Sequence, residues 1–361
     1  MSDYEALNNP LVLEKVFDYL PPSEVRNSFL VSRYWNHLLS VPKFWSWARL
    51  RITRERFDEM IESGILTRIS MLEVSCLPSA QLNKLYIWLA EAEDCHVKSL
   101  RVSGDLSSLP AVTLSLAVAR MEHLTFDRAV ASINQLDKIF SLLSQWEKLN
   151  LKSLTIEWSD SSTPFLRSLA PDLLTPALLR LEEVNLLGDC LAPHQVRHLL
   201  SFIADSEDLR LKRLNLSGND ISSIGPDLLA KSVVRLHEVI LINTRLTPLQ
   251  TDLLLANIVH SLTSPLSGLY LSDNNLSAAS PSLLAAGVLC LETVALDDTN
   301  LTTLQITSIL LQLCQSNNKK VRHIDMDGVD SSLIPEDIMT QVRDKFQLTK
   351  GFRVSQKDGK M

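Results

Sequence analysis

The sequence is poor in the residues and motifs on which most enzymes depend. Its 361 residues include only 10 glycines, fewer than the glycine-rich turns of a doubly wound nucleotide-binding fold usually require. It contains no P-loop, no HExxH, no GxSxG and no series of kinase motifs. We therefore predict that the chain is not an enzyme, and we predict neither a catalytic residue nor a cofactor.

Cysteine and long apolar runs are also scarce. The five cysteines are an odd number and include no pair at CxxC spacing, which indicates reduced thiols rather than a disulfide framework or a zinc knuckle. Residues 1–9 are polar and acidic, unlike a signal peptide. No uncharged apolar stretch reaches about 18 residues, the length of a membrane span. These features predict a cytoplasmic or nuclear protein without a membrane segment.

Acidic residues outnumber basic ones, and the acidic excess lies in the middle of the chain. The net charge is −7; residues 1–68 are neutral and residues 346–361 carry +3, so the residues between them carry −10. A nucleic-acid-binding protein usually has the opposite sign. We expect no nucleic-acid partner, and we expect the acidic middle region to meet a basic protein segment.

The sequence is rich in one internal repeat. Leu211-Lys-Arg-Leu-Asn-Leu-Ser-Gly-Asn-Asp-Ile221 places apolar residues at offsets 0, 3, 5 and 10 from its start. Other strong copies start at Leu181, Leu236, Leu266 and Leu291. Weaker copies start at Ile69, Val97, Met121, Leu151 and Val321. Five strong copies in one register exclude chance, so the repeat decides the architecture.

Each copy predicts a short strand followed by an amphipathic helix. Offsets 3 and 5 have the two-residue period of a strand, whereas the run Val196-Leu199-Leu200-Ile203 has helical spacing. Two kinds of copy alternate, and from Leu181 onwards each kind recurs every 55 residues. The kind that starts at 181, 236 and 291 carries a glutamine fourteen residues later: Gln195, Gln250 and Gln305. One copy cannot bury its apolar face alone, so the copies must stack on one another.

The pattern LxxLxLxxN resembles the leucine-rich repeat, and the alternation is similar to that of its ribonuclease-inhibitor class. The resemblance implies an α/β solenoid over residues 69–345, with about ten repeats in five pairs. It further implies a horseshoe with parallel strands on the concave face and helices on the convex face. Residues 346–361 are expected to be a polar basic tail.

The copies depart from the leucine-rich pattern at offset 8, where asparagine occurs only as Asn219 and Asn274. The other strong copies have Asp189, Thr244 and Thr299 there. A continuous asparagine ladder is therefore not expected, although each substitute can still hydrogen-bond a backbone turn.

Residues 10–45 do not follow the repeat. Pro10-Leu-Val-Leu-Glu-Lys-Val-Phe-Asp-Tyr-Leu20 places Leu13, Val16, Phe17 and Leu20 on one helical face, and Pro21-Pro22 ends that helix. A second segment follows Ser23, a suitable N-cap. A third carries Val31, Trp35 and Leu38. We expect a three-helix unit over residues 1–50 and a helical linker over residues 51–68.

The series Leu-x-x-Val-Phe-x-Tyr-Leu-Pro-Pro, Val-Ser-Arg-x-Trp and Pro-x-x-Trp resembles the F-box, a small all-α unit. The resemblance implies binding to the Skp adaptor of a cullin–RING ubiquitin ligase. Matched residue by residue, it implies these adaptor contacts: Pro10, Leu11, Val16, Phe17, Leu20, Pro21, Leu30, Val31 and Trp35. The family's usual Leu-Pro start is Asn9-Pro10 here, and its usual Cys before Arg is Ser32. The alternative is a generic helical cap that closes the solenoid.

The resemblance to an F-box followed by leucine-rich repeats implies a substrate receptor of an SCF-type ubiquitin ligase. In such a solenoid, residues at offsets 2, 4, 6 and 7 point out of the concave face. The expected protein-substrate contacts are Trp158, Leu187, Ile240, Ile242, Tyr270, Asp273, Asp297, Asp298, Asp325 and Asp327. Exposed large apolar residues often anchor interfaces. The alternative function is a leucine-rich scaffold or inhibitor that acts without ubiquitination.

Two further patterns resemble functional sites only in part. His194 and His198 have a metal-compatible spacing, but they adjoin an apolar helix face and no third ligand is near in sequence, so no metal site is predicted. The pairs Glu182-Glu183 and Asp297-Asp298 lie at strand positions. Catalytic carboxylates need an enclosing cleft, which an open sheet face does not provide.

Overall fold

The computed structural model describes residues 13, 16, 49–62, 65–67, 69–146, 149–157, 166–261, 263–316, 320–329, 332, 334–349 and 352–356. Its contacts divide the chain into two units. The first unit is Met1–Leu142 with Trp146–Leu151, and the second is Leu143–Gln145 with Lys152–Met361.

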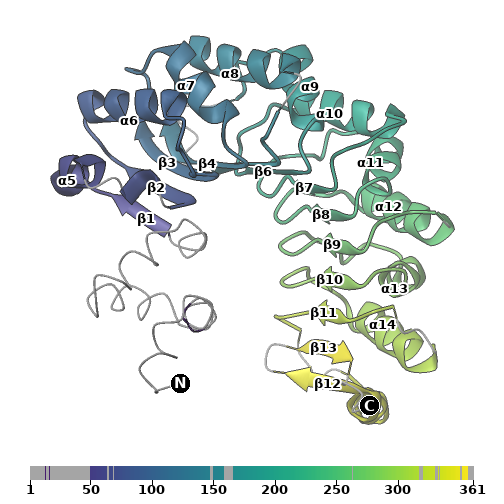
Figure 1. Cartoon of the computed structure of the whole chain (residues 1–361). Helices are drawn as coiled ribbons and strands as arrows, with labels where there is room; N and C mark the ends of the chain where they lie inside the picture. Colours follow the sequence, from purple (N-terminus) through teal and green to yellow (C-terminus); the bar gives the residue numbers. More distant parts are fainter. Residues whose placement is uncertain are drawn as a thin grey trace, which may run out of the picture. The chain divides into compact units, whose positions relative to one another are not determined.

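The described part of the first unit contains four parallel strands, labelled in Figure 1. They are β1 (Arg49–Ile52), β2 (Met71–Ser75), β3 (Ser99–Asp105) and β4 (His123–Val130). The helices are α5 (Phe57–Glu62), α6 (Ser79–Glu91), α7 (Ala111–Ala119) and α8 (Ile133–Gln145), and two short 3-10 turns cover Arg54–Arg56 and Ile65–Thr67. The last three residues of α8 belong to the second unit.

The second unit repeats the same strand–helix alternation. Its parallel strands are β5 (Ser153–Glu157), β6 (Glu183–Leu187), β7 (Arg213–Asn215), β8 (Glu238–Ile240), β9 (Gly268–Tyr270), β10 (Thr293–Ala295) and β11 (His323–Asp325). Its helices are α9 (Pro171–Leu179), α10 (Pro193–Asp205), α11 (Pro226–Val233), α12 (Pro248–His260), α13 (Pro281–Leu289), α14 (Thr303–Gln315) and α15 (Glu336–Lys345).

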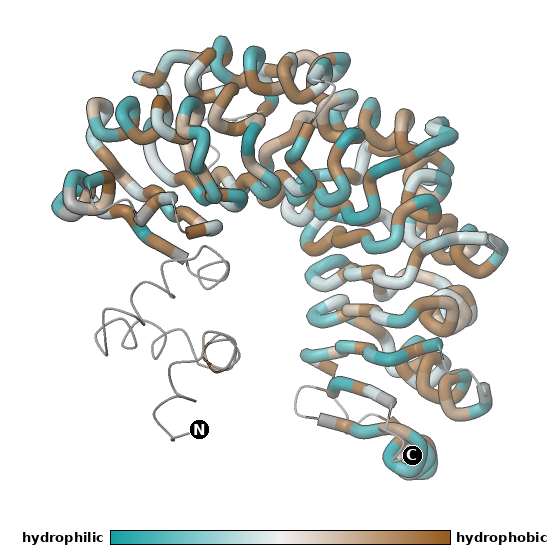
Figure 2. Tube along the Cα trace, in the orientation of Figure 1, coloured by the Kyte–Doolittle hydropathy of each residue, from teal (hydrophilic) through white to brown (hydrophobic). Residues whose placement is uncertain are grey.

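The predicted α/β class, with parallel strands alternating with helices, is confirmed. In every copy the strand begins two residues after the start assigned from the sequence, as with Glu183 after Leu181. Residues at offsets 3 and 5 point towards the helices and are buried, for example Val239 and Leu241. Hydrophobic and hydrophilic residues alternate along the tube for this reason (Figure 2).

The two kinds of copy differ in the length of their helices. The copies with the glutamine have helices of 13 residues, such as α10 and α12, whereas α11 and α13 have 8 and 9 residues. Gln250 shows what the glutamine does. Its Oε1 accepts a 2.8 Å hydrogen bond from the backbone N–H of Thr247, which closes a capping box at the start of α12.

The same glutamine joins its copy to the preceding one. Gln250 Nε2 donates to the carbonyl oxygens of Ile221 and Ile224, both at 2.8 Å. The pattern recurs at the equivalent residues Gln135, Gln195 and Gln305. All four are buried, so their amides satisfy buried backbone groups that water cannot reach.

The short-helix copies contribute a different bond. Arg120, at the end of α7, donates 2.8 Å and 2.6 Å hydrogen bonds to the carbonyl oxygens of Ala90 and Ala92 at the end of α6. Arg180 and Arg235 do the same for α8 and α10. A cation at a helix C-terminus satisfies free carbonyl groups and complements the helix dipole. Cys290 occupies the equivalent position after α13.

The asparagine ladder is interrupted, as expected. Asn274 Nδ2 donates to Leu241 O at 2.6 Å in the preceding copy and to Leu271 O at 2.9 Å in its own. Thr244 and Thr299 donate through Oγ1 to a carbonyl group of their own copy, and neither reaches the carbonyl groups of the preceding copy as Asn274 does. Thr244 Oγ1 also lies 3.3 Å from Asn274 Oδ1 in the following copy. The expectation was wrong for Asp189, which is exposed and pairs with Arg167 instead. Gly188, at φ 81°, turns the chain there and places Cys190 in the interior.

Two expectations at the ends of the repeat region were wrong. Residues 51 and 52 belong to β1 rather than to a helical linker, because Leu50 and Ile52 alternate with two arginines and Ile52 packs inward beside Val74. Nor are residues 346–361 simply a polar tail. Strands β12 (Phe346–Thr349) and β13 (Arg353–Gln356) form an antiparallel pair, and β13 adds to β11. Phe346 and Val354 are buried, which accounts for this hairpin.

Candidate binding surface

The second unit presents one face of its sheet without covering helices, here called the strand face (Figure 1). Residues at offset 4 lie side by side on it because the strands are in register. This row runs Thr155, Asn185, Asn215, Ile240, Tyr270, Ala295 and Asp325. Offset 2 forms a parallel row that includes Glu183, Arg213 and Glu238.

Backbone hydrogen bonds beyond the strand ends continue the strand face with a third row at offset 6. Gly188 N donates to Ser217 O at 2.8 Å, and Gly218 N donates to Ile242 O at 2.9 Å. Further bonds of the same kind extend the row through Ser272, Asp297 and Asp327. The predicted contacts Leu187 and Ile242 lie in this row.

The structure brings some of the predicted apolar contacts together. Ile240 and Tyr270 are partners in the β8–β9 register, and Ile242 follows Ile240 by two residues on the same face. All three are half-buried, as is Leu187. Leu187 lies apart from the other three, because β7, with polar Asn215, separates β6 from β8. The strand face therefore carries an apolar patch of Ile240, Ile242 and Tyr270.

Three of the predicted acidic contacts are engaged within the chain, including Asp327, whose Oδ1 accepts from the backbone N–H of Gly328 at 2.9 Å. Asp297 Oδ2 accepts from Ser272 Oγ at 3.2 Å, and its Oδ1 accepts from the backbone N–H of Asp327 at 2.7 Å. Asp325 Oδ1 lies 3.1 Å from Arg353 Nε on β13. Asp273, Asp298 and Asp327 are exposed.

Asp273 and Asp298 also have a backbone role that the sequence reasoning missed. Their φ angles are 59° and 52°, in the left-handed region. Offset 7 is left-handed in the other strong copies too, at Gly188, Gly218 and Asn243. Glycine, asparagine and aspartate adopt this conformation most easily. Their recurrence at offset 7 was the signal that could have predicted the turn.

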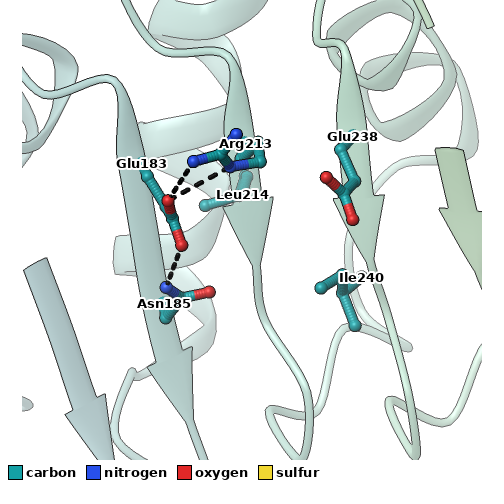
Figure 3. Close-up of a pocket in the computed structure, with 6 residues that line it drawn as sticks. All are labelled: Glu183, Asn185, Arg213, Leu214, Glu238 and Ile240. Atoms are coloured by element: carbon teal, nitrogen blue, oxygen red, sulfur yellow. Dashed lines mark hydrogen bonds and ion pairs between the residues drawn. The ribbon is translucent and has the colours of Figure 1, made fainter. Parts of the chain in front are cut away.

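A pocket of about 190 Å³ opens on the strand face between β6 and β8 (Figure 3). Its lining is Glu183, Asn185, Arg213, Leu214, Glu238 and Ile240. Arg213 binds Glu183 through Nε at 3.1 Å and also through Nη2. Asn185 Nδ2 donates to the other Glu183 oxygen at 2.9 Å. Arg213 is thus drawn to the β6 side of the pocket.

Glu238 forms the opposite wall and contacts the apolar patch. Burial, followed by the charge and proximity of Glu238, raises the pKa of Tyr270 to about 12, and the charge of Asp325 adds to the rise. The hydrogen bonds that Arg213 donates to Glu183 raise the pKa of Arg213, so the guanidinium stays positively charged. Sequence reasoning missed Glu183, Asn185 and Glu238, although offsets 2 and 4 were known to point outwards.

In the first unit, charged residues of the uncovered sheet face are paired across strands. Arg51 Nε lies 3.7 Å from Glu73 Oε1, and Arg101 Nη2 lies 2.9 Å from Asp127 Oδ2. Cross-strand pairs of opposite charge stabilise a sheet modestly. The charges of these residues therefore cancel in pairs, whereas Glu238 in the second unit forms no ion pair with a described residue.

Most of the predicted adaptor contacts cannot be placed. Of the helix expected after Pro10, the structure describes Leu13 and Val16, both helical; Leu13 is buried and Val16 is 42% exposed. The other adaptor contacts and one substrate contact lie outside the described residues: Pro10, Leu11, Phe17, Leu20, Pro21, Leu30, Val31, Trp35 and Trp158.

His198 bonds within the fold. Its Nδ1 lies 3.0 Å from Thr175 Oγ1, and its Nε2 lies 3.0 Å from Asp172 Oδ1. Within the described ranges, no three His, Cys, Asp or Glu side chains gather in a way that could hold a metal ion. None of the helices seen in those ranges is both long and apolar enough to cross a lipid bilayer.

Comparison with known proteins adds no assignment, because no family model matches the chain and no curated protein matches it.

Proposed function

We propose that this chain is the substrate-recognition subunit of an SCF-type ubiquitin ligase. In this proposal residues 1–50 form an F-box that binds the Skp adaptor, and residues 69–345 form a leucine-rich-repeat solenoid whose strand face binds a protein substrate. The observation that carries the ligase role is the F-box-like series that begins at Pro10 and continues through Trp35 to Trp45.

The repeat architecture supports the solenoid part of the proposal. Parallel strands alternate with helices at the spacing of the sequence copies, and side-chain amides join each long-helix copy to the copy before it. Stacked repeats of this kind provide extended binding surfaces, because one row of strands stays uncovered. The apolar patch of Ile240, Ile242 and Tyr270 lies on such a surface.

The proposed rate enhancement comes from proximity. A receptor that holds its substrate beside the ubiquitin-charged enzyme raises the local concentration of the acceptor lysine. This role needs two separate binding surfaces and no reacting group of the receptor. The F-box-like segment and the strand face would supply one surface each.

Adaptor binding tests the proposal directly. The full chain is co-expressed with the Skp adaptor, and a variant carrying Leu20→Ala and Pro21→Ala is compared with it. Burying a large apolar side chain contributes about 1.5–3 kcal/mol, so the double substitution should abolish co-purification. The matched control is Leu304→Ala, which alters a residue that is 65% exposed on α14.

The repeats of the double variant should keep the thermal transition of the parent chain. Co-purification of the double variant with the adaptor at the parent level would contradict the F-box assignment. Failure of the parent chain to bind the adaptor would favour a leucine-rich scaffold or inhibitor that acts without ubiquitination.

A further inference from the structure

The pocket of Figure 3 has an unequal distribution of charge. Glu183, Arg213 and Glu238 are neighbours in the offset-2 row, with the arginine between the two carboxylates. Arg213 nevertheless directs both of its hydrogen bonds to Glu183. Among the described residues, no cation forms an ion pair with Glu238. The three side chains together carry one net negative charge, and Glu238, whose charge also acts on Arg213 at longer range, is the carboxylate that Arg213 does not hydrogen-bond.

Glu238 is also held in position. The next residue in its row is Gly268, and a Cβ there would lie 3.2 Å from Glu238 Cγ and 3.4 Å from Tyr270 Cε2. The absent side chain leaves room for Glu238 Cγ beside β9, where the carboxylate opposes the ionisation of Tyr270. Among the described residues no ion pair engages this carboxylate, so most of its acceptor capacity is unused.

The surroundings of Glu238 are partly apolar. Ile240 lies on the same strand and the same face, and it lines the pocket with Glu238. Tyr270 adjoins Ile240 on β9. A ligand that presented a positive charge together with an apolar group would therefore meet both kinds of partner here.

We propose that this pocket binds an arginine or lysine side chain of a partner peptide, with Glu238 as counter-ion and with Ile240 and Tyr270 contacting an adjacent apolar residue. The proposal rests on the proposed function, since it names the chemistry that the strand face would recognise in a substrate. It commits to a protein segment because the charge to be matched is positive and an apolar surface lies beside it.

Competing occupants fit less well. A phosphate or a nucleic-acid backbone would approach the carboxylate of Glu238, and like charges repel. Arg213 provides no anion site in compensation, because Glu183 already engages its Nε and Nη2. A peptide carboxylate would meet the same repulsion.

Peptide selection by the purified full chain, without adaptor or ligase, tests the proposal. The probes are random peptide mixtures in which one position is fixed as arginine, lysine, citrulline or glutamate. Citrulline keeps the shape of arginine but lacks its charge. We expect retention of the arginine and lysine mixtures to exceed that of the citrulline mixture by about tenfold, which corresponds to 1.4 kcal/mol of charge-dependent binding. This comparison needs no altered protein.

Two variants then locate the charge. Glu238→Gln keeps the size of the side chain and should remove the preference for arginine over citrulline. Glu182→Gln is the matched control: it removes the same charge from a carboxylate that Lys212 already pairs at 3.2 Å, outside the pocket. The control should keep the preference. Ile240→Ala should keep it too, while losing selection for apolar residues at the adjoining position.

Three results would overturn the proposal. They are equal retention of the arginine and citrulline mixtures, equal losses in the Glu182 and Glu238 variants, or preferred retention of the glutamate mixture. Because the adaptor is absent, failure of the ligase role leaves a positive peptide result intact. Conversely, adaptor co-purification without arginine selection would place substrate recognition elsewhere on the chain.

Discussion

Gln250 Nε2 lies 2.8 Å from the carbonyl oxygen of Ile221, a residue of the preceding copy. The bond is one of three that the buried amide makes to the backbone, together with those to Ile224 O and Thr247 N. Buried backbone groups left without partners are costly, so the glutamine holds neighbouring copies together as well as capping its own helix.

This relationship predicts a large effect of Gln250→Leu. The substitution keeps the approximate size of the side chain but leaves two carbonyl oxygens and one N–H unsatisfied. Each such group costs about 1–3 kcal/mol, so we expect a loss of at least about 2 kcal/mol in the free energy of unfolding, measured by urea denaturation. Gln312→Leu, at a half-buried position of α14, is the control and should cost less than about 0.5 kcal/mol. Equal losses would show that the amide bonds are not responsible.

Leu241→Ala tests the assigned register of the copies. Leu241 is buried at offset 5, and its truncation should leave a cavity that costs about 2–5 kcal/mol. Leu249→Ala, which alters a side chain that is 61% exposed at the start of α12, should cost less than about 0.5 kcal/mol. Calorimetric unfolding of both variants measures the difference. A loss below about 1 kcal/mol for Leu241→Ala would contradict the register.

The acidic contacts can be tested without disturbing the turns. In a variant with Asp297, Asp298, Asp325 and Asp327 changed to Asn, the left-handed backbone at position 298 is retained, because asparagine adopts it as readily as aspartate. We expect capture of a basic substrate to weaken and to lose most of its salt dependence. For the parent chain, capture should decline as the Debye length falls from about 10 Å at 0.1 M to about 3 Å at 1 M salt. Unchanged identity and amount of captured protein would remove this acidic group from the recognition surface.

The contact between Glu238 and Tyr270 predicts an alkaline titration. A phenol whose pKa is raised to about 12 in the folded chain, from about 10 when unfolded, contributes stability below pH 10. That contribution is lost as the pH rises from about 10 to 12, because the unfolded chain releases the proton first. Among the described tyrosines, burial raises the pKa of Tyr86 even further than that of Tyr270, so spectroscopic titration should show two late-ionising phenols. Only the earlier of the two should disappear in Tyr270→Phe. In Glu238→Gln the pKa of Tyr270 should fall, because a carboxylate charge that opposes ionisation is removed. A Tyr270 titration unaffected by Glu238→Gln would contradict the contact.

The regular part of the fold was predictable from the sequence because each copy carries its own signal. Offsets 0, 3, 5 and 10 located the strands β2 to β11, and the glutamine position located the long helices α8, α10, α12 and α14. Strand β1 escaped notice because it has only four residues, two of them arginines, and no helix of the usual length follows it. The β12–β13 hairpin escaped because only Phe346, Leu348 and Val354 interrupt its polar residues.

The candidate pocket was less predictable, for a reason of geometry. Sequence position tells which face of a strand a side chain occupies, so Ile240 and Tyr270 could be assigned to the strand face. It does not tell which way a long side chain leans along that face. Arg213 leaning to Glu183, and Glu238 leaning over Gly268, decide where the unpaired charge lies. Those directions depend on three neighbouring strands at once.

Two kinds of hydrogen bond alternate between successive copies, and this alternation limits how the number of copies can change during evolution. Glutamine amides bind a long-helix copy to the short-helix copy before it, whereas arginines such as Arg235 bind a short-helix copy to the long-helix copy before it. Removing one copy would bring two copies of the same kind together, so that the glutamine or arginine of one would not face the carbonyl groups that it normally binds. Removing two successive copies would leave every remaining contact between unlike copies unchanged. The unit that can be duplicated or deleted without loss of these bonds is therefore the 55-residue pair of copies. We expect relatives of this chain to differ from it in repeat number by whole pairs.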